Sequence, residues 1–228
     1  MAMHIIDLPA WAVERGRGLN DFPALTAAGR TALVNIDMQN AFVADGGAFA
    51  GPHARDIIGV VNALSAAMRL IGAPVIWTRA THAAEGPFAS PAWQYDLSRP
   101  EIAAGVAALQ AGAEGHALHP AMEVAPGDTV IDKYRYGAFS CPAGRLAKAL
   151  EEVGAEMVVI TGVATNCCCE TTAREANMAG YKVIFAADAT ASLTDEEHNA
   201  ALLNLRLNFA DVRSTAELLA MARAVQNE

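Results

Sequence analysis

Short apolar runs alternate with longer amphipathic segments along most of this chain. The apolar runs predict strands at 31–37, 73–79, 128–133, 157–162 and 182–188, with a short edge strand at 211–214. The amphipathic segments predict helices at 54–71, 143–153, 166–179, 195–209 and 215–225. Apolar strands that alternate with such helices are typical of a parallel sheet covered on both faces. The predicted fold class is therefore α/β, a three-layer, Rossmann-like arrangement with a six-stranded parallel sheet and right-handed crossovers.

Two stretches fall outside this alternation. Residues 1–30 are expected to form a peripheral N-terminal arm, available to pack on a neighbouring subunit, and residues 31–228 to form the folded domain. Residues 80–127 separate the second and third predicted strands. A connection of that length in a compact domain is usually an insertion or a lid with a functional role.

The composition fits one folded domain and excludes several other classes of protein. The chain has 228 residues, of which 53% are apolar and 18% charged, so it can fill a core and is too apolar to be disordered. A net charge of −9 argues against a nucleic-acid partner, and no apolar run is long enough to cross a membrane. The N-terminus lacks a signal-peptide pattern, and Cys141 and Cys167 to Cys169 form no disulfide framework. We therefore expect a reducing, cytoplasmic location.

Reactive side chains follow three different predicted strands. Asp37 ends the first strand, Lys133 ends the third, and Cys167 to Cys169 open the helix after the fourth. Ligands of open parallel sheets bind at the carboxyl ends of the strands, so these groups are expected to converge on one edge. A thiol at a helix N-terminus beside a lysine favours the thiolate, and a nearby carboxylate can take up its proton. The plainer alternatives are a turn-capping Asp37, a solvated Lys133 and cysteines that serve as small core residues.

Three motifs give the chain a family resemblance. They are ALVNIDMQNAF (32–42), PGDTVIDKYRYGAF (126–139) and VVITGVATNCCCETTAREA (158–176). With them the chain resembles the isochorismatase-like cysteine hydrolases, a group that contains nicotinamidases, N-carbamoylsarcosine amidases and ureidoacrylate amidohydrolases. The resemblance implies the strand order 3-2-1-4-5-6, no organic cofactor, a small-molecule substrate and assembly into a homodimer or homotetramer.

The resemblance also implies a role for each reactive residue. Asp37 would be the general base, Lys133 its partner and Cys168 the nucleophile. The N–H groups of Ala164 and Cys168 would hold the oxyanion, and the peptide bond between Val163 and Ala164 would be cis. Cys167 and Cys169 are expected to pack, because successive helical positions point about 100° apart and only one of the three thiols is expected to face the pocket; the alternative for these two is redox or accessory chemistry.

Departures from the relatives narrow the expected substrate. Nicotinamidases carry an Asp-x-His metal site after the second strand; here His82 matches, but Ala80 stands at the Asp position, so no metal is expected. The pair His116 and His119 has no third ligand nearby in the sequence. A cysteine at position 168 favours hydrolysis of a non-peptide C–N bond, with release of ammonia or carbamate. The stretches 37–49 and 133–139 most resemble the ureidoacrylate amidohydrolase branch, which points to a ureido or carbamoyl compound.

Six further residues are candidates to line a substrate pocket: Phe42, His82, Trp93, Arg135, Tyr136 and Phe139. For the aromatic residues among them, the alternative is packing in the core. Arg135 either clamps a substrate carboxylate or lies on the surface. Two other functions stay open. An isochorismatase that cleaves a vinyl ether would keep its activity in Cys168→Ala, and a catalytically idle ligand-binding protein would turn over no amide.

Overall fold

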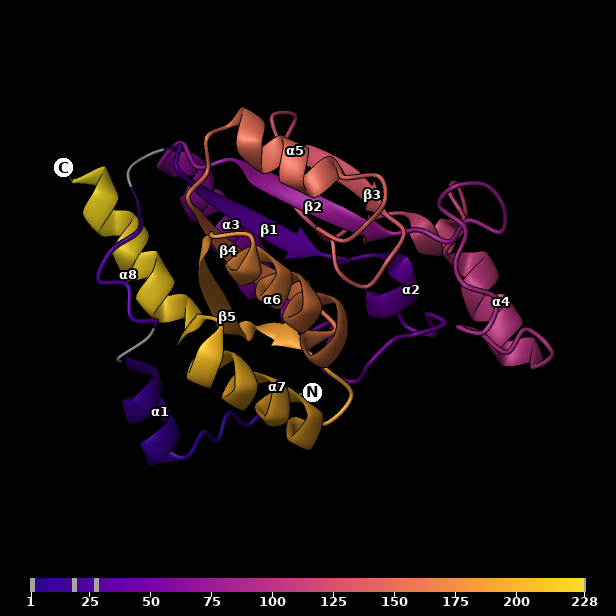
Figure 1. Cartoon of the computed structure of the whole chain (residues 1–228), viewed down its shortest axis with the longest axis horizontal. Coiled ribbons are helices and arrows are strands. Elements are labelled where there is room, and N and C mark those ends of the chain that lie inside the picture. The colour runs from indigo at the N-terminus through magenta and orange to yellow at the C-terminus, as the bar shows by residue number, and fades with distance from the viewer. Residues whose placement is uncertain (1–2, 18–19, 27–28, 228) are drawn as a thin grey trace.

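The protein is built around a single parallel sheet. The computed structural model describes residues 3–17, 20–26 and 29–227, so residues 1–2, 18–19 and 27–28 of the expected arm, and residue 228, lie outside the described residues. The six strands of the sheet are β1 (Thr31–Ile36), β2 (Val75–Ala80), β3 (Thr129–Lys133), β4 (Met157–Val163), β5 (Lys182–Ala191) and β6 (Asp211–Arg213). They pair in parallel in the order β3-β2-β1-β4-β5-β6 (Figure 1). The predicted fold class and strand order are both confirmed.

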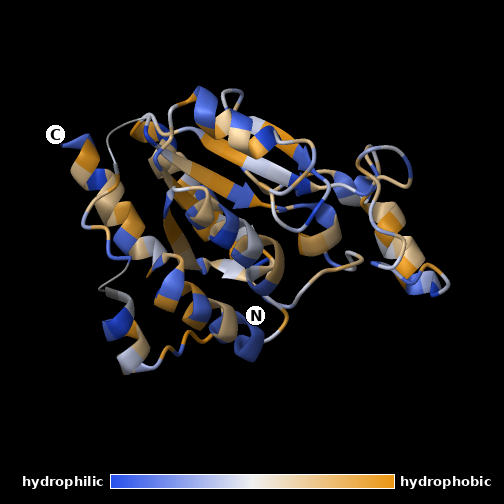
Figure 2. Ribbon diagram, viewed as in Figure 1, coloured by the Kyte–Doolittle hydropathy of each residue, from blue (hydrophilic) through white to orange (hydrophobic). Residues whose placement is uncertain are grey.

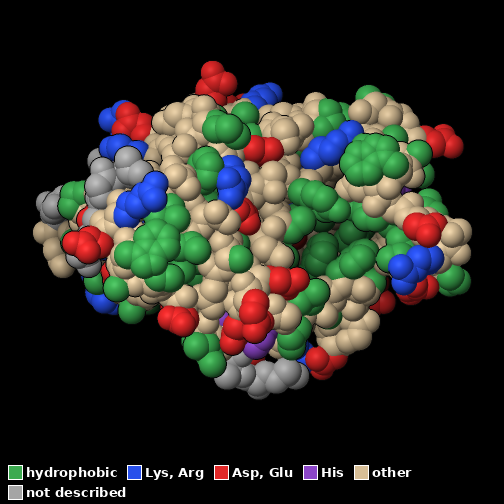
Figure 3. All heavy atoms as spheres, turned by 60° about the horizontal axis from the view of Figure 1, so that its bottom comes forward, with side chains coloured by type: hydrophobic (Ala, Val, Ile, Leu, Met, Phe, Trp, Pro, Cys, Tyr) green, Lys and Arg blue, Asp and Glu red, His purple; other side chains and the backbone are tan. Residues whose placement is uncertain are grey.

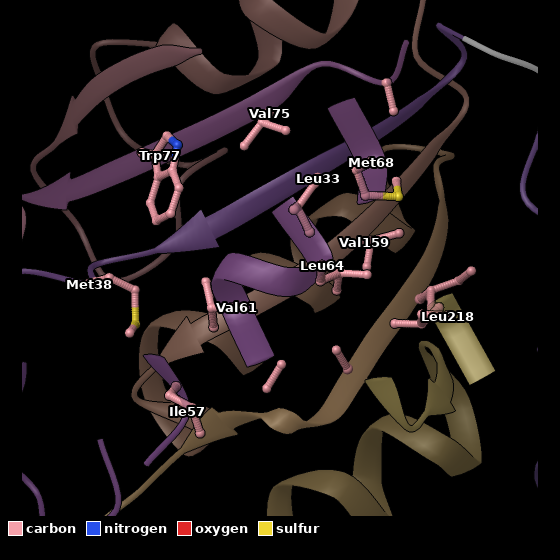
Figure 4. Close-up of a cluster of buried hydrophobic side chains, with 14 of the residues drawn as sticks. Leu33, Met38, Ile57, Val61, Leu64, Met68, Val75, Trp77, Val159 and Leu218 are labelled. Atoms are coloured by element: carbon pink, nitrogen blue, oxygen red, sulfur yellow. The ribbon is translucent and has the colours of Figure 1, made fainter. Parts of the chain in front are cut away.

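Helices cover both faces of the sheet and bury alternate residues of its strands. On one face, α3 (Ile58–Leu70) and α8 (Thr215–Gln226) pack on side chains that include Leu33, Trp77 and Val159 (Figure 4). On the other face, α5 (Arg145–Glu152), α6 (Glu170–Met178) and α7 (Asp195–Asn208) cover Val34, Ile160 and Phe185. Because successive strand residues point to opposite faces, both faces need apolar side chains. Figure 2 accordingly shows hydrophobic strands inside more mixed helices.

The structure adds elements that the hydrophobic pattern did not predict. These are α1 (Ala10–Arg17), α2 (Asn40–Val43), α4 (Pro100–Ala108) and the short 3₁₀ helix η1 (Glu114–His116). The predicted helix at 166–179 is divided into a turn of π-helix, η2 (Thr165–Cys169), followed by α6. Of these, α2 and η1 present too few turns for a 3.6-residue period to stand out.

The arm and the long connection lie at different ends of the molecule. The arm packs on α7 of its own chain, since the N–H groups of Ile5 and Asp7 donate to the side chains of Asp195 and Asn199. Residues 80–127 carry α4 and η1 and extend beyond the carboxyl ends of the strands, beside α2 (Figure 1). They therefore lie where a substrate pocket is expected. No helix among the described residues is long and apolar enough to cross a membrane.

Candidate active site

A cavity of about 160 Å³ opens at the carboxyl end of the sheet. Its wall combines residues from the ends of two strands, namely Lys133 on β3 and Ala164, Cys167 and Cys168 after β4, with residues of the 80–127 segment. A second cavity lies next to it and shares Phe42, Phe49 and Ala164 in its wall. In Figure 3 hydrophobic side chains gather in a hollow toward the right of the molecule. The volume of the first cavity suits a small organic molecule.

Asp37 and Lys133 form a buried ion pair at the floor of this region. Lys133 Nζ lies 2.8 Å from Asp37 Oδ2, and the side chains are 2% and 0% exposed. The hydroxyl of Thr78, on β2, donates to Asp37 Oδ1 at 2.7 Å. Asp37 adopts a left-handed backbone conformation with φ 51°, which non-glycine residues rarely adopt and which recurs at functional sites. The carboxylate is thus held in a fixed position just after β1.

The ammonium of Lys133 links this carboxylate to a thiol. Lys133 Nζ donates to Cys168 Sγ at 3.4 Å and to the carbonyl oxygen of Arg135 at 3.1 Å. Burial alone disfavours the charged lysine, but Asp37 and Cys168 outweigh it and raise the pKa of Lys133. The lysine therefore stays charged and places a positive charge beside the sulfur.

The π-turn decides how the three adjacent thiols point. The N–H of Cys169 donates to the carbonyl oxygen of Ala164 at 3.1 Å, five residues back, which makes the turn wider than in an α-helix. Cys167 and Cys168 both line the cavity, whereas Cys169 is fully buried and its thiol reaches the carbonyl oxygen of Thr161 at 3.8 Å. The expectation that only one of the three thiols faces the pocket is wrong, because it assumed a regular α-helix.

The two pocket thiols differ in acidity. A hydrogen bond from Cys168 lowers the pKa of Cys167, against the effect of burial. The same hydrogen bond, together with burial, raises the pKa of Cys168, although the Lys133 ammonium opposes this. The sequence favoured a thiolate at the start of the helix; the structure instead gives Cys168 a protonated thiol that needs a base.

Close backbone packing brings β4 to this site. Gly162 has φ 108°, and a Cβ on it would lie 2.0 Å from the carbonyl oxygen of Ile36, so only glycine fits there. The next peptide bond, between Val163 and Ala164, is cis, which is the geometry that the family resemblance implies. Ala164 then enters the wall of both cavities, and η2 begins after it.

Four of the six candidate pocket residues line the cavity, and two do not. Phe42, His82, Arg135 and Tyr136 are in its wall. Trp93 is 85% exposed and absent from the wall, because the loop turns its side chain outward. Phe139 is also absent from the wall and packs against the ring of Tyr181, with the ring centroids 5.6 Å apart. The expectation of a pocket position for Trp93 and Phe139 is therefore not met by the structure.

Tyr95 takes the place in the wall that the sequence analysis gave to Trp93. Its hydroxyl accepts from the amide of Gln94 at 3.3 Å. Burial, and then the neighbouring Tyr136, raise the pKa of Tyr95. The rings of His82 and Tyr95 meet edge to face at 5.9 Å, and burial lowers the pKa of His82. Nothing in the local sequence distinguishes Tyr95 from Trp93, since both lie in a loop without periodicity.

Arg135 is held by backbone rather than by a carboxylate. Its guanidinium donates to the carbonyl oxygens of Phe88, Ala89 and Tyr134 at 2.6–3.2 Å. None of the ion pairs among the residues that the structure describes involves Arg135. Arg135 lines the cavity, and its fixed guanidinium, which has no ion-pair partner among the described residues, is suited to bind an anion.

The residues after β2 do not fit the nicotinamidase type of metal site. Ala80 offers no donor at the carboxylate position, and its N–H is bound by Gln39 Oε1 at 2.7 Å. The ring of His82 bonds to Ser90 at 3.3 Å. The rings of His116 and His119 have separate partners, the hydroxyl of Thr81 and the N–H of Ala121. These residues therefore do not form a metal site of that type.

A group of histidines lies behind the site, at the start of α7. His4, His53 and Asp195 place ligand-type atoms within 4.8 Å of one another. In His4, however, Nδ1 is bonded to Asp195 at 2.7 Å and Nε2 accepts the N–H of Ser192 at 3.0 Å. Both ring nitrogens are thus engaged, so this group fits a hydrogen-bonded anchor for the arm better than a metal site.

The fold and the site together define an α/β protein with a carboxylate, an ammonium and a thiol at the carboxyl edge of its sheet. Residues 31–217 match the isochorismatase domain, and the chain belongs to the isochorismatase family. It is 34% identical to nicotinamidase 3 of Arabidopsis thaliana over 180 residues, which cover 78% of this chain and 82% of that protein. It is 33% identical to the ureidoacrylate amidohydrolase RutB of Pseudomonas syringae pv. syringae over 226 residues, 92% of this chain and 90% of that protein.

Solved structures show the same fold. A cysteine hydrolase from Pseudomonas syringae pv. phaseolicola superposes with a TM-score of 0.77, covering 90% of this chain and 99% of that one at 23% sequence identity. The family match begins at residue 31, so the arm before β1 lies outside the matched domain. The family predicted from the three motifs is confirmed.

Proposed function

We propose that this protein is an amidohydrolase that cleaves a non-peptide C–N bond of a small amide, ureido or carbamoyl compound through a thioacyl intermediate on Cys168. The observation that carries the proposal is the Lys133 ammonium, 2.8 Å from Asp37 Oδ2 and 3.4 Å from Cys168 Sγ in the cavity wall. The names of the nicotinamidase and ureidoacrylate amidohydrolase relatives support hydrolysis of a C–N bond.

The residues divide the chemistry between them. Asp37 accepts the proton of the Cys168 thiol, and the sulfur attacks the substrate carbonyl while Lys133 stabilises the charge on sulfur. The N–H groups of Ala164 and Cys168 hold the oxyanion. Asp37 then passes its proton to the leaving nitrogen, the C–N bond breaks, and ammonia departs, while the carbonyl carbon stays on Cys168 as a thioester; with a ureido substrate, the acid that hydrolysis then releases is a carbamate. Water, deprotonated by Asp37, attacks the thioacyl carbon and releases the acid and the Cys168 thiol.

Arg135 favours a ureido acid within this class of substrates. Its guanidinium lines the cavity with no carboxylate partner in the described part of the chain, so a substrate carboxylate would supply the missing charge. We expect Arg135→Gln to raise KM for 3-ureidoacrylate or 3-ureidopropionate by about 10- to 100-fold, the equivalent of a charge-assisted hydrogen bond. A neutral amide of similar size is the control, and its KM should change far less. Equal effects on both substrates would instead assign Arg135 to loop positioning.

The test of the proposed function is ammonia release by the purified protein from a panel of ureido acids and small amides. Cys168→Ala should lower kcat by at least about 10³-fold on any substrate that is turned over. Cys169→Ala is the matched control, because that thiol faces away from the cavity, and it should keep most of the activity. Rapid quenching should also trap an acyl adduct on Cys168, seen by peptide mass spectrometry.

Two results would replace the proposal by its alternatives. Hydrolysis of a vinyl ether that survives in Cys168→Ala would make the protein an isochorismatase in activity as well as in family. Tight binding of a panel compound without turnover, and without an acyl adduct, would make it a ligand-binding protein.

A further inference from the structure

The π-turn places two neighbouring thiols in one cavity wall. In the family motif a single position separates Asn166 from the proposed nucleophile, and here that position is also a cysteine. Cys167 and Cys168 both line the cavity, and each thiol shifts the pKa of the other. In an α-helix adjacent side chains diverge, whereas at this wider turn both thiols line the same cavity.

The two thiols are chemically unequal. Cys167 is the more exposed of the pair, and the hydrogen bond from Cys168 lowers its pKa. Cys168 is 7% exposed and contacts Lys133. Thiolate character and access set the rate at which a cysteine reacts with an oxidant, so Cys167 is the first of the two that a peroxide in the cavity would meet.

We propose that Cys167 and Cys168 are a reversible oxidation site, at which hydrogen peroxide converts the pair of thiols into a disulfide and blocks the nucleophile. The Cys167 thiolate attacks the peroxide, the O–O bond breaks, and Cys167 becomes a sulfenic acid with loss of hydroxide. The Cys168 thiol attacks the sulfenic sulfur, the S–O bond breaks, and hydroxide leaves and becomes water with the thiol proton. Two thiols and one peroxide thus give one disulfide and two waters, with two electrons passing to the peroxide.

Geometry makes this disulfide easy to reduce. The Cα atoms of adjacent residues are about 3.8 Å apart, below the range of about 4.4–6.8 Å in ordinary disulfides. The linkage is therefore strained, and strained disulfides exchange readily with external thiols. The pair would protect Cys168 from irreversible oxidation to the sulfinic acid while the oxidant persists. The loss of hydrolysis rests on the proposed function, whereas the oxidation itself does not.

The experiment treats the reduced full-length protein with a small excess of hydrogen peroxide and follows free thiols, intact mass and peptide masses. The expected product has lost two thiols and the mass of two hydrogen atoms, with Cys167 and Cys168 in one linked peptide. Dithiothreitol should restore the thiols and any hydrolytic activity. A second measurement needs no variant: the reduced wild type should bind one equivalent of phenylarsine oxide, a reagent for paired thiols, and dithiothreitol rather than a monothiol should release it.

Cys167→Ser is the test variant and Cys169→Ser the matched control. After treatment with peroxide, Cys167→Ser should gain oxygen atoms at Cys168. With dithiothreitol it should then recover at least fivefold less activity than Cys169→Ser, each relative to its own untreated activity (about 1 kcal/mol of difference). A wild type that gains only oxygen atoms, or that ignores phenylarsine oxide, would overturn the proposal. If no amide is hydrolysed, the thiol and mass readouts still decide it, so the two failures are distinguishable.

Discussion

Replacing one member of the buried ion pair of Asp37 and Lys133 should destabilise the fold more than replacing both members. Lys133→Met leaves a fully buried carboxylate without a counter-charge, and Asp37→Asn leaves a buried ammonium without one. Removing one partner of a buried pair typically costs about 3–5 kcal/mol, whereas replacing both by uncharged groups is close to neutral. The double variant should therefore be more stable than either single variant.

The expected size of the effect follows from the length of the chain. An unfolding entropy of about 2.1 cal/mol/K per residue, over 228 residues, converts 3–5 kcal/mol into a fall in Tm of about 6–10 °C. In Asp37→Asn the side-chain oxygen can still accept a hydrogen bond from the hydroxyl of Thr78, which donates to Asp37 Oδ1 at 2.7 Å in the wild type. The double variant should thus lie within about 1–2 kcal/mol of the wild type.

The assay is a double-mutant cycle, measured by thermal and urea unfolding at neutral pH. The exposed ion pair of Arg30 and Glu156 is the matched control, and the same cycle there should give a coupling below about 1 kcal/mol. If Lys133→Met alone stays within about 1 kcal/mol of the wild type, the carboxylate is not a buried charge that needs its partner, and the reasoning fails.

Three further predictions concern pH and the cavity wall. The pKa of Lys133 is raised in the folded protein, so this lysine should contribute stability that is complete below about pH 10.4 and is lost as the pH rises further. Alkaline unfolding curves should show this loss in the wild type but not in the double variant of Asp37→Asn and Lys133→Met. Burial lowers the pKa of His198 to about 3, so between about pH 6.5 and pH 4 the unfolded chain binds a proton that the native protein does not. The free energy of unfolding should therefore fall by about 3 kcal/mol over this range. Urea titrations of the wild type and of His198→Gln measure the difference. Tyr95→Phe should raise KM by about 2- to 10-fold, with kcat nearly unchanged, because it removes a hydroxyl from a residue of the cavity wall. Trp93 is exposed, so Trp93→Phe should change neither constant, and steady-state kinetics on the best substrate decide.

The hydrophobic pattern alone determined the architecture of this protein. Strands buried on both faces are continuous apolar runs, and amphipathic helices carry their period over several turns, so both are visible locally. Once the strands are located, their carboxyl ends are also located, which is why Asp37, Lys133 and the run of Cys167 to Cys169 could be expected at one edge, while the family resemblance singled out Cys168. The structure brings these three groups together as expected.

The wall of the cavity was decided only by the tertiary structure. The turn after β4 is a π-helix, so two thiols rather than one enter the cavity, and an α-helical spacing rule could not foresee this. Tyr95 lines the cavity while Trp93 points outward, and Arg135 is held by backbone carbonyls of a distant loop. Side-chain direction in a loop depends on contacts made far away in the sequence, and those contacts exist only after the sheet has brought the segments together.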